Sequence, residues 1–144
     1  MTDSRKSIAV DTGVFVALLS SKERAHKACL NVLSQLPGTT TFFTTEACLT
    51  ETSFLLGSNA QLRSEWQKLI ELLQIAIVPL DGSGLVRVFE LLDKYHDLPM
   101  DLADATLVVA CEKLGARTVF TLDRTDFSIY RPKHCRRFDL LPAE

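Results

Sequence analysis

The sequence predicts a three-layer α/β domain built around a mostly parallel sheet. Short aliphatic or aromatic segments alternate with longer segments of helical periodicity along the 144 residues, and Gly and Pro residues separate them. Helices that join successive strands place those strands in parallel pairs and cover both faces of the sheet. The chain has no internal repeat and no dividing linker, so we expect one domain over residues 1–144 with its core at about residues 7–141.

Turn-forming residues mark the ends of the elements in the first half of the chain. Asp11 ends the first strand, and Pro37-Gly38 stops the second helix. Gly57 is placed to end the third helix in a left-handed conformation. We expect a strand at residues 7–10, helices at 14–19 and about 25–36, a strand at 40–43, and helices at about 44–56 and 61–73.

The second half continues the alternation of strands and helices. Pro79 stops an aliphatic strand, and Asp81-Gly82 opens a helix. Gly115 is placed to end the following helix. We expect a strand at residues 75–78, a helix from 81 to about 95, a loop around 99, a helix at about 101–114, a strand at 118–121 and an edge strand at 138–141.

The composition is that of a folded protein with little net charge. Hydrophobic residues make up 47% and charged residues 24% of the chain, which excludes a disordered or collagen-like protein. The 16 Lys and Arg residues against 18 Asp and Glu residues give a net charge of −2. This balance argues against bulk electrostatic binding of nucleic acid but leaves open a local basic groove or a bound metal ion.

No segment of the sequence predicts insertion into a membrane or secretion. No apolar run approaches the roughly 20 residues that a membrane-spanning helix needs. The apolar residues 8–10 are too few for the central part of a secretory signal. Cys29, Cys48, Cys111 and Cys135 form no C-x-x-C pair and are interpreted as reduced thiols. We therefore expect a cytoplasmic protein with no membrane partner.

Two aspartates follow predicted strands directly. Asp11 comes after the first strand and Asp123 lies just past the strand at 118–121. If these strands are parallel neighbours, the two carboxylates meet at the edge where ligands bind in open α/β sheets. A single Asp at either position would more often be a turn former or a helix cap, so the pair carries more weight than either residue alone.

Glu51 falls on the apolar face of its predicted helix. Its neighbours three and four positions away include Cys48, Phe54 and Leu55. A carboxylate placed there costs several kcal/mol of desolvation unless it is paired or bound to a cation. A buried salt bridge with an Arg, or a side chain that reaches out to solvent, would also explain this position.

Asp101 and Asp104 lie on nearly the same side of one helical turn. Both could have only the structural role of stabilising the start of the helix, Asp101 as its N-cap and Asp104 as an acid in its first turn. Leu107 and Val108 follow Asp104 at helical spacing and turn it toward the core.

The acids that point to one edge of the sheet would repel each other without a counterion. Four carboxylates in a small volume are tolerated only when they are protonated or bind cations. Ligand sets of oxygen without nearby His or Cys favour Mg²⁺ or Mn²⁺. A metal held this way activates water and offsets charge on a phosphodiester, so the pattern predicts phosphodiester hydrolysis.

Four stretches of the chain carry a family resemblance, each with one of these acids. They are IAVDTGVFVA at residues 8–17, TEACLTETSFLL at 45–56, DLADATLVVAC at 101–111 and TLDRTDF at 121–127. In this order and spacing they resemble the PIN-domain family, the small metal-dependent nucleases that include the VapC-type toxins of bacterial toxin–antitoxin pairs. The resemblance covers almost the whole chain and implies a PIN-like α/β/α fold.

The resemblance also implies roles for individual residues and partners. It implies an endoribonuclease that depends on Mg²⁺ or Mn²⁺, acts as the toxin of a VapC-type pair, binds a cognate antitoxin protein and forms a homodimer. The implied catalytic metal ligands are Asp11, Glu51, Asp104 and Asp123, with Asp101, Asp126, Thr12 and Thr121 as supporting residues.

Basic residues gather near the C-terminus and suggest a path for RNA. Arg124, Arg131 and Lys133, followed by Arg136 and Arg137, give this region a local positive charge that could guide a phosphate backbone. An ordinary solvated surface explains the same cluster.

Two other functions fit parts of the pattern. A phosphate-accepting α/β regulator, such as a receiver or a haloacid-dehalogenase-like domain, also places an Asp after a strand. Such a receiver would have paired acids after its first strand and the dehalogenase-like domain an Asp-x-Asp, whereas this chain has Asp11-Thr-Gly-Val. A non-catalytic PIN-like RNA-binding module is the other alternative.

Overall fold

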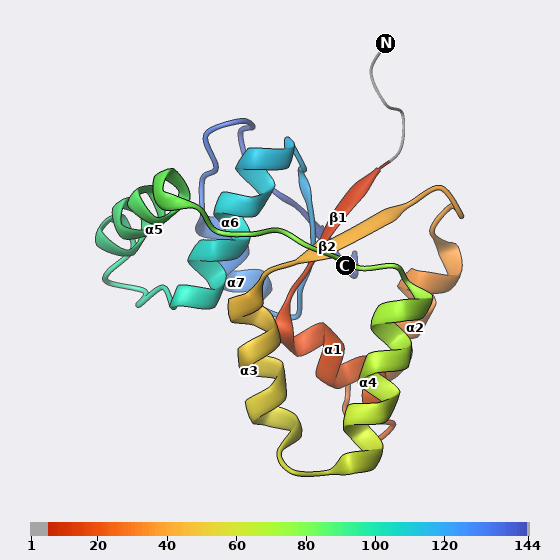
Figure 1. Ribbon diagram of the computed structural model, residues 1–144. Coiled ribbons are helices and arrows are strands. Elements are labelled where there is room, and N and C mark those ends of the chain that lie inside the picture. Colours follow the sequence, from red (N-terminus) through yellow and green to blue (C-terminus); the bar gives the residue numbers. More distant parts are fainter. Residues whose placement is uncertain (1–5, 144) are drawn as a thin grey trace.

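The computed structural model describes residues 6–143, which fold around a five-stranded sheet (Figure 1). The strand order is β3-β2-β1-β4-β5, and every neighbouring pair is parallel. The predicted, mostly parallel sheet is therefore confirmed, with the last strand at an edge as expected. The strands are β1 (Ser7–Val10), β2 (Thr41–Thr44), β3 (Ala76–Ile77), β4 (Thr118–Phe120) and β5 (Asp139–Leu141).

The central strand β1 is buried on both faces because its side chains alternate between two cores. Ala9 lies beside Phe43 and Val119 on one face. Ile8 and Val10 belong to the core on the other face. This alternation follows from the twofold side-chain period of a strand, and it explains why β1 is apolar at every position after Ser7.

Helices cover both faces of the sheet and complete three layers, as the sequence predicts. One core is completed by α1 (Thr12–Leu19), α2 (His26–Gln35) and α4 (Ala60–Leu72), and the other by α5 (Gly82–Lys94), α6 (Leu102–Leu114) and α7 (Arg124–Ile129). Helix α3 (Glu46–Leu56) contributes Cys48 to one core and Leu49 to the other. In Figure 1, α5 and α6 lie on the opposite side of the strands from α2 and α4.

Helix α6 is the most deeply buried helix of the described chain. Every residue from Ala103 to Cys111 is buried. Gly115 ends the helix in the left-handed conformation, with φ +69° and ψ 22°, as predicted. Gly57 also has a positive φ of +66°, but its ψ of −148° lies outside the left-handed helical region.

Two elements differ from the sequence expectation. Helix α7 is not predicted, because six residues are too few to show helical periodicity. Strand β3 has only two residues rather than the four expected at 75–78, and Ile77 is 38% exposed at its end of the sheet.

Other features of the described residues agree with the sequence. Cys29, Cys48 and Cys111 are buried thiols, Cys135 is half-buried, and all four are free. No helix in residues 6–143 has the length and apolar character needed to cross a membrane.

Candidate metal centre

Five carboxylates line one pocket of about 430 Å³, which we call the acid pocket. It lies where β1 and β4 end and where α1, α6 and α7 begin. This is the carboxyl edge of the parallel strands, where the sequence places Asp11 and Asp123. The acids are Asp11, Glu51, Asp101, Asp104 and Asp123.

Three of these aspartates are also helix N-caps. Asp11 accepts a hydrogen bond from the Thr12 N–H at 2.8 Å. Asp101 accepts one from the Asp104 N–H at 2.8 Å, and Asp123 one from the Asp126 N–H at 3.4 Å. The same three aspartates therefore cap helices and line the acid pocket. The positive ends of α1 and α6 favour negative charge here and offset part of the repulsion.

Asp11 is buried and held at both oxygens. Its Oδ1 accepts the Thr12 N–H, and its Oδ2 accepts a 2.7 Å hydrogen bond from the Thr121 hydroxyl. Burial raises the pKa of Asp11 above its usual range, these hydrogen bonds partly offset that rise, and the charges of Asp101 and Asp123 add to it. Asp11 is thus fixed in orientation, and both burial and the neighbouring charges disfavour its ionised form.

Asp104 is the second buried acid, as its spacing from Leu107 and Val108 predicts. It is 8% exposed, and burial, followed by the charges of Asp11 and Asp101, raises its pKa to about 8. A carboxyl with this pKa is mostly protonated at neutral pH when no cation is near.

Tyr130 holds Asp104 and is a site residue that the sequence does not reveal. Its hydroxyl donates a 2.8 Å hydrogen bond to Asp104 Oδ2. The Tyr130 ring is fully buried and makes edge contacts with Tyr95 and Phe127, both with centroids 5.1 Å away. Tyr130 follows the short helix α7, which has no pattern in the sequence, so no sequence signal pointed to this contact.

The burial expected for Glu51 is wrong. Its side chain is exposed at the pocket rim, and so are the next residues of its apolar face, Phe54 at 84% and Leu55 at 57%, whereas Cys48 is fully buried. Apolar spacing predicted a buried face, but within residues 6–143 the part of α3 that carries Phe54 and Leu55 stays uncovered. Partial burial, followed by the charges of Asp101 and Asp11, still raises the pKa of Glu51.

Asp126 joins the acids although it does not line the pocket. One carboxylate oxygen from each of Asp104, Asp123 and Asp126 lies within 4.8 Å of the other two. Asp11 and Glu51 face the same pocket but are not members of this compact group. Partial burial and the Asp123 charge raise the pKa of Asp126.

The two supporting threonines, Thr12 and Thr121, make different contacts. Thr121 bridges two acids, since its hydroxyl donates to Asp11 and accepts the Asp123 N–H at 3.0 Å. The Thr12 hydroxyl donates instead to the Cys48 carbonyl at 3.3 Å, which ties α1 to α3. Only the backbone N–H of Thr12 contacts an acid of the pocket.

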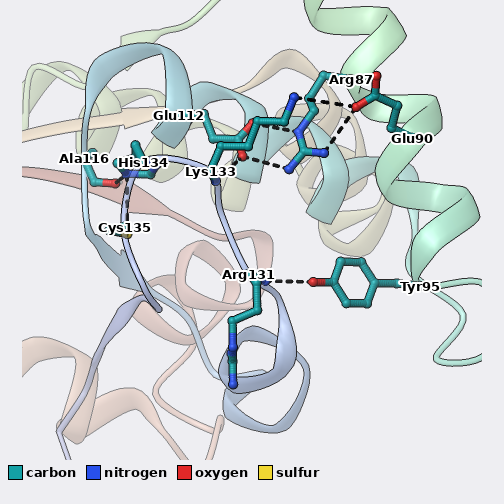
Figure 2. Close-up of polar contacts among 9 residues, drawn as sticks. All are labelled: Arg87, Glu90, Tyr95, Glu112, Ala116, Arg131, Lys133, His134 and Cys135. Carbon is teal, nitrogen blue, oxygen red and sulfur yellow. Dashed lines mark hydrogen bonds and ion pairs between the residues drawn. The ribbon is translucent and has the colours of Figure 1, made fainter.

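None of the three basic residues expected to bind RNA lines the acid pocket. Arg124 donates to the Pro142 carbonyl, and Lys133 Nζ lies 3.7 Å from Glu90. Arg131 follows α7, and its N–H donates to the Tyr95 hydroxyl at 2.8 Å (Figure 2).

Comparison with known families shows which family the chain belongs to. The model of the PIN domain family matches residues 8–131. The chain belongs to the PIN domain family. PIN nucleases generally depend on divalent metal, and the Asp104, Asp123 and Asp126 group provides an acidic cluster of the kind such dependence requires. Membership of this family replaces the receiver-like and dehalogenase-like alternatives.

Individual relatives of this PIN domain are distant. Ribonuclease VapC26 of Mycobacterium tuberculosis is 25% identical over 135 residues, which cover 92% of this chain and 98% of that protein. The crystal structure of M. tuberculosis VapC20, a sarcin-ricin loop cleaving toxin, matches with a TM-score of 0.75 at 19% identity, over 90% of this chain and 98% of that one. VapBC2 of Rickettsia felis, bound to a DNA fragment from its promoter, matches with a TM-score of 0.66 at 15% identity, over 93% and 98% of the two chains. The two structural matches establish the PIN fold.

Proposed function

We propose that this protein is an endoribonuclease that hydrolyses RNA phosphodiester bonds with Mg²⁺ or Mn²⁺ and serves as the toxin of a VapC-type pair. The observation that carries the proposal is the acid pocket at the carboxyl edge of the sheet, where Asp104 and Asp123 of the pocket also lie within 4.8 Å of Asp126. The metal ligands in this proposal are Asp11, Glu51, Asp104 and Asp123, with Asp101 and Asp126 in support.

The donor set fits a hard divalent cation. Among the described residues, every titratable side chain that lines the pocket is a carboxylate, and none is a His or Cys. Burial, followed by the charges of Asp11 and Asp101, raises the pKa of Asp104 to about 8, so the negative charge of this acid is disfavoured when no cation is near. A bound divalent ion would relieve that repulsion and would supply an activated water and charge compensation for the phosphodiester.

The protein's own residues orient the acids for this chemistry. Thr121 and the Thr12 N–H fix both oxygens of Asp11, and the Tyr130 hydroxyl fixes one oxygen of Asp104. Leu55 and Leu122 form apolar walls beside the acids, where a ribose or base of the bound strand would pack.

RNA as the substrate is supported by the relatives. The protein with 25% identity over nearly its whole length is named a ribonuclease, and VapC20 is described as cleaving the sarcin-ricin loop. An RNA-cutting protein of this kind would act in the cytoplasm.

A protein partner and self-association are further parts of the proposal. Several similar structures are toxin–antitoxin complexes, among them one from Klebsiella pneumoniae. The exposed Phe54 and Leu55 lie beside the acid pocket, where an antitoxin could cover it. Leu85, Val86 and Phe89 of α5 are exposed and would suit a homodimer contact.

The test is cleavage of a defined RNA pool by the purified protein in EDTA, Mg²⁺ or Mn²⁺, beside the Asp11→Asn variant. We expect cleavage only with metal and only by the unmodified protein, which excludes a contaminating ribonuclease. RNA binding without any metal-dependent cleavage would instead support the non-catalytic module.

A further inference from the structure

A second charged cavity lies at the other end of α7 from the acids. Arg131, Arg136 and Arg137 line a space of about 390 Å³ in the segment between α7 and β5. We call it the arginine pocket. All three side chains belong to exposed residues.

The arginine pocket carries positive charge that the described carboxylates leave unpaired. Within residues 6–143, no Asp or Glu forms an ion pair with Arg131, Arg136 or Arg137. The neighbouring cations differ, because Arg87 pairs with Glu112 and Glu90, and Lys133 pairs with Glu90 (Figure 2). The charge of these three arginines is therefore available to an anion from outside the described chain.

The segment that carries the arginines is held at several points. The Arg131 N–H donates to the Tyr95 hydroxyl, and the Lys133 N–H donates to Glu112 Oε2 at 2.7 Å. His134 Nε2 lies 2.6 Å from the Ala116 carbonyl oxygen, as Figure 2 shows. Pro132 and Phe138 are buried on either side. A binding loop fixed in this way loses little conformational entropy when it takes up a ligand.

The guanidinium of Arg131 is oriented by the C-terminal end of α7. Its Nη1 donates to the carbonyls of Ser128, Ile129 and Tyr130 at 2.6, 3.1 and 3.2 Å. All three bonds use the same nitrogen, so Nη2 and Nε remain for a ligand. A guanidinium fork that is already placed suits a planar contact to two oxygens of a phosphate.

Helix α7 connects the two pockets. Asp123 caps its start in the acid pocket, and Tyr130, which donates to Asp104, immediately precedes Arg131. Six helical residues span about 9 Å. A nucleic acid strand bound at the acids would therefore reach the arginine pocket within a few nucleotides.

We propose that the arginine pocket binds backbone phosphate of the RNA strand that is cut at the acid pocket. This inference rests on the proposed ribonuclease function. The acid cluster and a net charge of −2 oppose the approach of RNA, so binding needs a local positive site. Of the five basic residues that the sequence analysis placed in this cluster, Arg131, Arg136 and Arg137 line the pocket, whereas Arg124 and Lys133 do not.

The test uses a double variant and a control of equal charge. Arg136→Gln with Arg137→Gln removes two arginines and leaves Arg131, which also caps α7. Arg24→Gln with Lys27→Gln removes two exposed cations near the start of α2. Affinity for a fluorescent single-stranded RNA is measured in EDTA, which prevents cleavage, over a series of salt concentrations.

We expect the arginine variant to bind RNA about tenfold more weakly or worse, with the control unchanged. The slope of log affinity against log salt should fall by about 1.4, which is roughly 0.7 for each lost phosphate contact. If cleavage is active, KM should rise while kcat at saturating RNA stays the same.

Equal RNA affinity and equal salt slope for both variants would overturn the inference, and so would an unmodified protein that binds no RNA in EDTA. If the arginine variant loses affinity only for a polyglutamate peptide, the pocket takes protein carboxylates and the inference is wrong. The binding assay does not depend on cleavage, so failure of this inference is distinguishable from failure of the ribonuclease proposal.

Discussion

The Thr121 hydroxyl donates a 2.7 Å hydrogen bond to Asp11 Oδ2, although the two residues lie 110 positions apart. The same hydroxyl oxygen accepts the Asp123 N–H at 3.0 Å. Thr121 is fully buried just after β4, and Asp11 follows the neighbouring strand β1. One threonine thus connects two acids that parallel strand pairing brings together.

Replacing Thr121 with Val should weaken RNA cleavage without unfolding the protein. Valine keeps the shape but removes the donor to Asp11 and the acceptor for Asp123, and loss of such an orienting contact typically costs 10–100-fold in metal affinity or activity. We expect a loss of about 1–3 kcal/mol in the free energy of unfolding. The measurement is kcat/KM over a Mg²⁺ titration.

Thr52→Val is the matched control for that experiment. Thr52 is also fully buried, but its hydroxyl donates only to the Cys48 carbonyl within α3, at 2.7 Å. Equal activity of the two variants would show that the Thr121 contact does not orient the acids.

Stability without metal should fall as pH rises. The folded protein keeps a proton on Asp104 up to about pH 8, whereas the unfolded chain releases it near the ordinary pKa of 3.8. Between these values the folded state binds more protons, so the free energy of unfolding decreases with pH, and the raised pKa of Asp11 acts in the same direction. The decrease should be on the order of a few kcal/mol.

Urea unfolding in EDTA at pH 5, 6, 7 and 8 measures this dependence. Asp104→Asn carries no titrating carboxyl at that position, and its stability should change less over the same range. A flat profile for the unmodified protein would mean that Asp104 is ionised throughout.

Tyr130→Phe should move the pH dependence of cleavage upward. The Tyr130 hydroxyl donates to the Asp104 carboxylate and so lowers the pKa of that acid, opposing the effect of burial. Without this donor Asp104 holds its proton to higher pH, and metal binding requires its release. The acidic limb of the cleavage profile is the readout, because a purely structural defect would lower the rate equally at every pH.

A phenylalanine substitution at Tyr95 supplies the control. Tyr95 packs against Tyr130, but its hydroxyl accepts the Arg131 N–H rather than contacting an acid. An equal shift of the pH profile in both variants would contradict the role given to Tyr130.

The contact between α5 and α6 should depend on one ion pair. Arg87 Nε and Nη2 donate to Glu112 at 3.0 and 2.9 Å, and both side chains are mostly buried. We expect Glu112→Gln to lower the free energy of unfolding by about 1–3 kcal/mol, because it removes the buried partner of Arg87 and leaves only the half-exposed Glu90 as its counterion. Glu90→Gln, at a half-exposed partner of the same Arg87, should cost less than about 1 kcal/mol. If urea unfolding gave equal losses of stability for the two variants, the buried Arg87–Glu112 pair would contribute no more than the exposed Arg87–Glu90 pair.

The sequence predicted those parts of the structure that follow from local patterns. Parallel strand alternation predicted that Asp11 and Asp123 meet, and the spacing from Leu107 and Val108 predicted the burial of Asp104. Glu51 was misjudged because the apolar pattern of α3 continues through Phe54 and Leu55, which nothing in the described chain covers. Periodicity shows that a face is apolar, but only tertiary packing decides whether it is buried.

The contacts that complete the site depend on a helix too short to predict. Helix α7 places Asp126 near Asp104 and Asp123 and delivers the Tyr130 hydroxyl to Asp104. Six residues cover less than two turns, so neither contact has a signature in the sequence.

The most direct test compares the cleavage rate of one defined single-stranded RNA by the unmodified protein, Asp104→Asn and Asp81→Asn in Mg²⁺. Asp81 is an N-cap like three of the acids, but it begins α5 and lies outside the acid pocket. We predict that Asp104→Asn lowers the rate by at least roughly a thousandfold, while Asp81→Asn cuts at the normal rate. Cleavage by Asp104→Asn at the rate of the unmodified protein would contradict the assignment of the acid pocket as the catalytic centre.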